Sequence, residues 1–184
     1  LILSLYLNQL SFWLCVAAVP VILLYPGAKR VFPVPQLVLS VAWGFGVLIS
    51  WSAVTGSLDR ATWLLWGATV CWTLGFDTVY AMSDREDDKR IGVKSSALFF
   101  GKYAPEAIAV FFAGTVLFLG WLGVVMQLHL AFWMTLVLAT AGWVWQYTRL
   151  RDPQLPHPAY GEMFRQNVWL GFLLLGGMIA GILV

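Results

Sequence analysis

Six long runs of apolar residues, each almost free of charge, constrain this chain more than any other feature of its sequence. The hydrocarbon core of a bilayer is about 30 Å thick and needs about 20 apolar residues per helix. Backbone groups in lipid must be hydrogen-bonded internally, and the runs lack the alternation of a membrane strand. The sequence therefore predicts an all-α fold, a multi-span transmembrane bundle of six helices. The runs are Leu1–Leu24, Leu37–Gly56, Ala61–Ser83, Ala107–Met126, Leu130–Tyr147 and Val168–Val184.

The composition excludes a soluble globular domain. Hydrophobic residues make up 60% of the 184 residues and charged residues only 11%, whereas a soluble domain is about a quarter charged. The chain also has 11 Trp residues, a residue type that collects at membrane–water interfaces. A formal net charge of +2 is too small to indicate a nucleic acid partner. We therefore expect residues 1–184 to form a single transmembrane helical domain whose surroundings are the lipid bilayer.

The connections between the runs predict an orientation. Three connections are long and charged, namely Tyr25–Gln36, Asp84–Glu106 and Thr148–Asn167, and they hold two, five and three of the 11 Lys and Arg residues. The remaining cation, Arg60, lies in a short turn on the other side. Because cytoplasmic loops carry an excess of Lys and Arg, we expect the long charged loops to be cytoplasmic.

Five of the nine carboxylates lie between Asp77 and Asp88, at the end of the third run. On a helix with 100° per residue, Asp84 falls at about −20° and Asp88 at about +20° from Asp77. Asp87 lies roughly 80° from this stripe, and Glu86 lies on the opposite face. The pattern thus predicts three carboxylates on one stripe of a helix that leaves the membrane.

This stripe indicates a metal–diphosphate site. Aligned carboxylates repel one another, and Asp77 inside an apolar run is costly without a partner. Mg²⁺ takes one or two protein carboxylates and completes its coordination with water and phosphate oxygens. An ordinary solvated loop, or an Asp77 that caps a neighbouring helix, is the alternative explanation. We expect the helix to end near Gly92, and the cations that follow the stripe would face the phosphates: Arg85, Lys89, Arg90, Lys94 and Lys102.

The stretch DTVYAMSDREDD, followed by IGVKSSALFFGKY, resembles the second aspartate-rich motif of the UbiA family of intramembrane aromatic prenyltransferases. The stretch YPGAKRVFPVPQ is similar to a loop of the branch that acts on 4-hydroxybenzoate. The six expected helices agree with the last six of the family's nine. The resemblance implies Mg²⁺-dependent transfer of a polyprenyl group from polyprenyl diphosphate to an aromatic acid, 4-hydroxybenzoate, in ubiquinone or plastoquinone biosynthesis. It implies a multi-pass protein of a bacterial inner (plasma) membrane.

The resemblance also implies roles for individual residues. Asp77, Asp84 and Asp88 would be ligands of Mg²⁺, directly or through water, and Tyr80 would lie near the same cavity. Lys94 would pair with the diphosphate.

Two further cations are implied to reach this site from the preceding loop. Lys29 and Arg30 would contact the diphosphate or the carboxylate of the acceptor, and bidentate pairing favours Arg30 for a carboxylate. Both are equally well explained as cations that anchor the cytoplasmic end of a helix.

One departure from the family is serious. The family's first aspartate-rich motif, Asn-Asp-x-x-Asp-x-x-x-Asp, does not occur in this sequence, which begins at Leu1. We therefore expect the chain to be the C-terminal portion of a longer prenyltransferase and to be inactive alone.

Other classes of protein remain open. A secondary transporter also places an acidic residue inside a helix, and a non-catalytic membrane subunit needs no chemistry of its own. Within the family, homogentisate or another quinone precursor is an alternative acceptor. The sequence indicates neither the prenyl chain length nor the oligomeric state.

Overall fold

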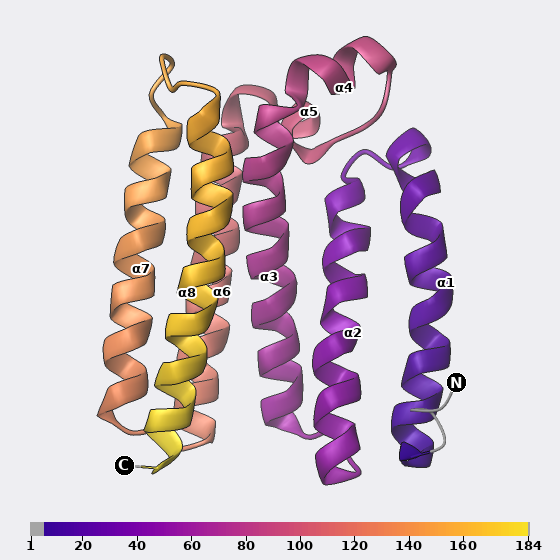
Figure 1. Cartoon of the computed structure of the whole chain (residues 1–184), viewed down its shortest axis with the longest axis vertical. Helices are drawn as coiled ribbons and strands as arrows, with labels where there is room; N and C mark the ends of the chain where they lie inside the picture. Colours follow the sequence, from indigo (N-terminus) through magenta and orange to yellow (C-terminus); the bar gives the residue numbers. More distant parts are fainter. Residues whose placement is uncertain (1–5, 184) are drawn as a thin grey trace.

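The computed structural model describes residues 6–183, in which six long helices run side by side along one axis (Figure 1). The expected all-α bundle of six long helices is confirmed for this part of the chain. Residues 1–5 and 184, at the ends of the first and last expected helices, lie outside the described residues. The long helices are α1 (Gln9–Val31), α2 (Pro35–Thr55), α3 (Arg60–Ser83), α6 (Ala104–Val125), α7 (Leu130–Leu150) and α8 (Pro158–Leu183).

Two short helices cover one end of the bundle, between α3 and α6. They are α4 (Arg85–Ile91) and α5 (Ser96–Phe100), and the 3-10 turn η2 (Gly101–Tyr103) leads into α6. The connections α1–α2, α3–α6 and α7–α8 all lie at this end, whereas the α2–α3 and α6–α7 turns lie at the opposite end (Figure 1). The expectation that the cation-bearing connections share one end is therefore confirmed. We refer to this end as the charged end.

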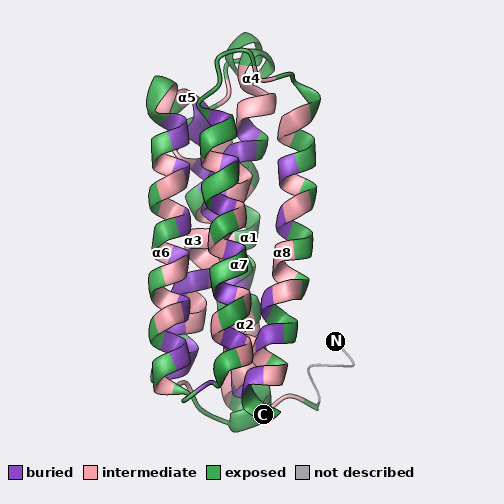
Figure 2. Cartoon of the chain, turned by 90° about the vertical axis from the view of Figure 1, so that its left-hand side faces the viewer, coloured by how far each residue is buried: buried purple, intermediate pink, exposed green. Residues whose placement is uncertain are grey.

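The bundle has the surface of an integral membrane protein. Within residues 6–183, four segments are long and apolar enough to cross a membrane: α1, α2, Ser96–Val125 and α8. Figure 2 shows buried residues on the sides of the helices that face neighbours, and exposed residues along the outside. Many of the exposed side chains are large and apolar, as lipid requires. Since α3 and α7 have 24 and 21 residues and lie alongside the four, we infer that they also cross the membrane.

The expected bounds of α1 and α8 are wrong by several residues. α1 continues to Val31 through Pro20 and Pro26, because membrane helices tolerate prolines whose lost hydrogen bonds are satisfied by neighbouring groups. α8 begins at Pro158, ten residues before Val168, and proline at the first helical position costs no hydrogen bond. In both cases the helix extends past its apolar part into the charged end, so the connecting loops are shorter than expected.

α3 lies between α2, α6 and α8 and organises the bundle. Its start is fixed by a capping box, in which Thr62 N donates to Asp59 Oδ1 (2.9 Å) and Asp59 N donates to Thr62 Oγ1 (3.1 Å). The main apolar core forms where α3, α6, α7 and α8 meet. The end of α3 that carries Asp77 extends from this core to the loops of the charged end. Its most deeply buried large members are Phe132, Ile108, Leu122, Met163 and Val79.

Candidate metal and diphosphate site

The three carboxylates lie on two helices and the residue between them. α3 ends at Ser83 and α4 begins at Arg85, so the expected single helix through Asp77, Asp84 and Asp88 is wrong. Asp84 adopts φ −94° and ψ 3°, which turns the chain; its carboxylate accepts from Ser83 Oγ (3.0 Å), and its carbonyl accepts from Asp88 N (2.8 Å). The expected end at Gly92 is confirmed, with φ 74°.

Burial separates these carboxylates from their acidic neighbours. Asp77, Asp84 and Asp88 are half-buried, whereas Glu86 and Asp87 are exposed. The helix break therefore changes the geometry of the stripe without turning its three members toward solvent.

Lys29 is the cation of α1 that lies closest to these carboxylates. Its positive charge acts on both Asp77 and Asp88. The negative charges of the same two carboxylates act on the hydroxyl of Tyr25, which is also in α1. The carbonyl of Lys29 accepts from Lys94 N (2.6 Å), which joins the end of α1 to the segment that follows α4. Arg30 is exposed, and of the two expected cations Lys29 is the one whose charge acts on these carboxylates.

Asp88 lies outside the membrane-spanning segments, and its ionisation reflects the crowding of charge. Burial raises the pKa of Asp88 above its ordinary value, and the charges of Asp84 and Asp87 raise it further. A hydrogen bond with Ser95 and the charge of Lys29 act in the opposite direction. A bound cation would favour the ionised carboxylate and so reverse the rise.

The carboxylates do not form a finished metal cage. Within residues 6–183, no group of three His, Cys, Asp or Glu side chains is arranged to hold a metal ion. In the same part of the chain, the one ion pair within 4.0 Å joins Arg165 to Glu162. The donor set nevertheless suits Mg²⁺, which needs only one or two protein carboxylates when phosphate oxygens and water supply its other ligands.

An apolar cavity of about 290 Å³ opens between α2, α3 and α8 on the membrane side of these carboxylates. Thr73 lines the cavity and lies one helical turn before Asp77, on the same face of α3. Tyr80 is exposed, and its ring lies 5.4 Å from the ring of Phe164, which also lines the cavity. Asp77 thus lies one helical turn beyond the lining of an aromatic-walled space that suits a hydrocarbon, on the side of the charged end.

Two residues that support this end of the bundle have no local signal in the sequence. The buried Gln36 Oε1 accepts from Ser96 N (2.8 Å), which ties α2 to the start of α5. His157 Nε2 lies 2.9 Å from Ser83 O and joins the α7–α8 loop to the end of α3. Both are missed by sequence reasoning because their partners are 60 and 74 residues away.

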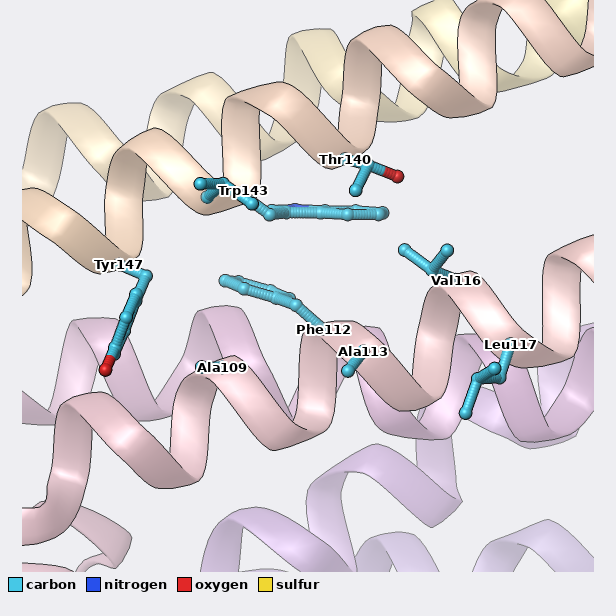
Figure 3. A pocket seen from close by; sticks show the side chains of 9 residues that line it. Ala109, Phe112, Ala113, Val116, Leu117, Thr140, Trp143 and Tyr147 are labelled. Carbon is cyan, nitrogen blue, oxygen red and sulfur yellow. The ribbon is translucent and has the colours of Figure 1, made fainter.

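A second hollow, of about 330 Å³, lies between α6 and α7 (Figure 3). Phe112 of α6 and Trp143 of α7 stack across it, with ring centroids 5.2 Å apart. We call this hollow the outer groove and the cavity beside Asp77 the inner cavity.

Fold and site together define a polytopic membrane protein that presents carboxylates and a lysine at the mouth of a hydrocarbon-sized cavity. The chain belongs to the UbiA prenyltransferase family, whose model matches residues 1–181. The resemblance found in the sequence is therefore confirmed.

Named relatives agree with this assignment. The chain is 65% identical over 179 residues to a 4-hydroxybenzoate solanesyltransferase of Synechocystis sp., covering 97% of this chain and 61% of that protein. It is 39% identical over 180 residues to a 4-hydroxybenzoate octaprenyltransferase of Serratia proteamaculans, covering 96% and 60%. The chain thus spans about three fifths of the length of these relatives.

Two solved structures share the fold. One is the apo structure of a UbiA homolog from Aeropyrum pernix K1, with a TM-score of 0.76 at 23% identity, covering 96% of this chain and 66% of that one. The other is a structure of digeranylgeranylglyceryl phosphate synthase, with a TM-score of 0.81 at 17% identity, covering 100% and 65%.

Proposed function

We propose that the full-length protein transfers a polyprenyl group from polyprenyl diphosphate to 4-hydroxybenzoate in ubiquinone or plastoquinone biosynthesis. The observation that carries this proposal is the set of half-buried carboxylates Asp77, Asp84 and Asp88 beside Lys29, at the mouth of the inner cavity. Relatives at 65% and 39% identity bear the names of 4-hydroxybenzoate prenyltransferases, which favours an enzyme over a transporter or a non-catalytic subunit.

Mg²⁺ is the proposed cofactor, held by Asp77, Asp84 and Asp88 directly or through water. When bound, it would neutralise the diphosphate and make it a better leaving group. Lys29, which lies beside the carboxylates, and Lys94 from the α4–α5 connection would pair with the phosphate oxygens. The site would thereby place positive charges beside the negatively charged diphosphate of the donor.

The remaining residues position the substrates and exclude water. The inner cavity would hold the isoprenoid part of the donor between aromatic side chains, among them Phe76 and Phe164. An apolar cavity protects an electron-deficient allylic carbon from hydrolysis. Tyr80, whose ring contacts Phe164, would close the end of the cavity nearest the carboxylates. The work of the protein is therefore positioning and charge stabilisation.

We further propose that the charged end faces the cytoplasm of a bacterial inner membrane. Ten of the 11 Lys and Arg residues lie in the connections at this end or in the helix ends that adjoin them, as the positive-inside rule requires. Residues 1–184 would form a single transmembrane domain, the C-terminal portion of the enzyme, to which the rest of the protein adds the other aspartate-rich motif.

The proposal is tested with the full-length protein in lipid vesicles, with solanesyl diphosphate as the prenyl donor and 4-hydroxybenzoate as the acceptor. We expect a prenylated product that requires Mg²⁺, disappears with EDTA and returns when Mg²⁺ is added in excess. Prenylation of homogentisate instead would assign a different acceptor. Correctly inserted protein that forms no product with either acceptor would refute the proposal.

The two neighbouring cations at the end of α1 offer a matched comparison. Lys29→Met removes a charge that acts on Asp77 and Asp88, whereas Arg30→Gln removes an exposed charge. We expect Lys29→Met to raise the KM for the diphosphate donor about tenfold, the value of one charge-assisted hydrogen bond. Arg30→Gln is expected to leave this KM nearly unchanged. A larger effect at Arg30 would show that the assignment of the two residues is reversed.

A further inference from the structure

Asn167 of α8 is the centre of a buried polar network in the middle of the bundle. Its Oδ1 accepts from two indoles, Trp72 Nε1 of α3 and Trp143 Nε1 of α7, each at 3.0 Å. Its Nδ2 donates to Gln146 Oε1 (3.2 Å) and to the carbonyl of Met163 (2.9 Å). Asn167 is only 3% exposed, and these bonds use both donor hydrogens and both acceptor positions of the amide.

This network fixes the orientation of Trp72. A buried indole N–H without an acceptor is costly, so the ring is held where Asn167 can accept its hydrogen. One turn further along α8, Gly171 packs against the same ring, and an added Cβ there would lie only 2.7 Å from Trp72 Cη2. Phe76 contacts the same indole edge-to-face at 5.9 Å. Trp143 also contacts this ring edge-to-face, with ring centroids 6.3 Å apart, so contacts from α3, α7 and α8 together define one position for the indole.

The two tryptophans of the network face different spaces. Trp72 lines the inner cavity together with Phe76 and Asn167 itself. Trp143 lines the outer groove, where its indole stacks on Phe112 (Figure 3). The two rings also contact each other edge-to-face at 6.3 Å. A change at Trp72 therefore alters the lining of the inner cavity, whereas a change at Trp143 alters the lining of the outer groove and the same network.

We propose that Asn167 is a positioning residue that holds Trp72 as a wall of the inner cavity, and that this wall selects the prenyl donor by the shape of its first isoprene units. Trp72 precedes Asp77 by five residues, about 7.5 Å along α3 at 1.5 Å per residue. Trp72 also lies about 140° around α3 from Asp77, so its indole would meet the hydrocarbon of the donor through the inner cavity, which it lines. The inference rests on the proposed function, because it assumes that the inner cavity receives the donor.

The test compares Asn167→Leu, Trp72→Phe and Trp143→Phe in the full-length protein. The two donors are all-trans solanesyl diphosphate and its isomer with a cis first double bond, which differ only in the shape of the first isoprene unit. We expect Asn167→Leu and Trp72→Phe to change the ratio of kcat/KM between the two donors by about tenfold, a magnitude typical of reshaped apolar pockets. The change should arise mainly in the donor KM. The KM for 4-hydroxybenzoate and the Mg²⁺ dependence should stay as in the parent protein.

Trp143→Phe is the matched control. It removes the same kind of N–H···O bond to Asn167 but keeps an aromatic ring over Phe112 and against Trp72, so it should lower the thermal midpoint as Trp72→Phe does. It should leave the donor ratio unchanged. Asn167→Asp keeps oxygen acceptors for both indoles and should restore most of the ratio lost in Asn167→Leu.

The possible outcomes separate this inference from the proposed function. The inference would be overturned if Asn167→Leu and Trp72→Phe left the donor ratio unchanged. It would also be overturned if Trp143→Phe changed the ratio equally, because the network would then have only a structural role. If the parent protein binds both donors in a titration but transfers neither, the proposed function fails, and the ratio of donor affinities in the same variants then decides the inference. A parent protein that binds neither donor would overturn both.

Discussion

Asp84→Asn or Asp88→Asn in the full-length protein is expected to lower the rate of prenyl transfer by about 10²- to 10³-fold, the usual loss when one electrostatic group of an active site is removed. The amide has nearly the size of the carboxylate but lacks its charge, so the Mg²⁺ affinity should fall as well. The rate of product formation across a Mg²⁺ titration measures both effects.

Asp87→Asn is the control for these substitutions. It removes the same charge from α4, the helix that carries Asp88, but from an exposed position. Its activity should stay close to that of the parent protein. If Asp84→Asn and Asp88→Asn retained full activity in properly inserted protein, the metal site would lie elsewhere, and a supporting, non-catalytic role would fit this part of the chain better.

Gly177→Ala is expected to destabilise the bundle by about 1–3 kcal/mol, as overpacking of a close helix contact does. A Cβ at Gly177 of α8 would overlap Thr135 Oγ1 of α7 and would lie 2.8 Å from Thr135 Cβ. Because Thr135 Cβ is attached to the backbone, rotation of the side chain cannot relieve the clash, and the two helices must separate. The thermal midpoint of the purified protein in detergent reports the change.

The adjacent glycine provides the comparison for this substitution. An added Cβ at Gly176 meets nothing within 4 Å, so Gly176→Ala should be neutral or slightly stabilising through helix propensity. Equal thermal midpoints for the two variants would mean that α7 and α8 are not in close contact at Gly177.

The sequence predicts the bounds of a helix well where the apolar run extends over the whole helix, and less well where the helix continues beyond the apolar run. α2, α3 and α7 start or end within a few residues of the expected runs, because their apolar residues extend over the whole helix. α1 and α8 continue into polar sequence at the charged end, where water satisfies the side chains and hydropathy no longer marks a helix. The prolines at positions 20 and 26 favour a break in α1. The helix nevertheless continues through both, because neighbouring groups can satisfy the backbone groups that the prolines leave without a hydrogen bond.

The candidate site shows a different limit. The identity of the half-buried carboxylates follows from angular spacing, since Asp77, Asp84 and Asp88 are separated by burial from their acidic neighbours. The helix break does not follow, because the residues around Asp84 include neither Gly nor Pro. The bonds of Asn167 also depend on which helices are neighbours, and no single segment contains that information.

The break between α3 and α4 also places the boundary between lipid and water at the site. Asp77 belongs to a helix within the lipid-facing bundle, whereas Asp88 belongs to a short helix beyond its end. A molecule with an ionic head and a hydrocarbon tail, such as the proposed donor, would then bind the carboxylates with its head still in water and its tail still in the bilayer. Diphosphate released at this position would pass directly to water, while the lengthened aromatic product would stay in the bilayer.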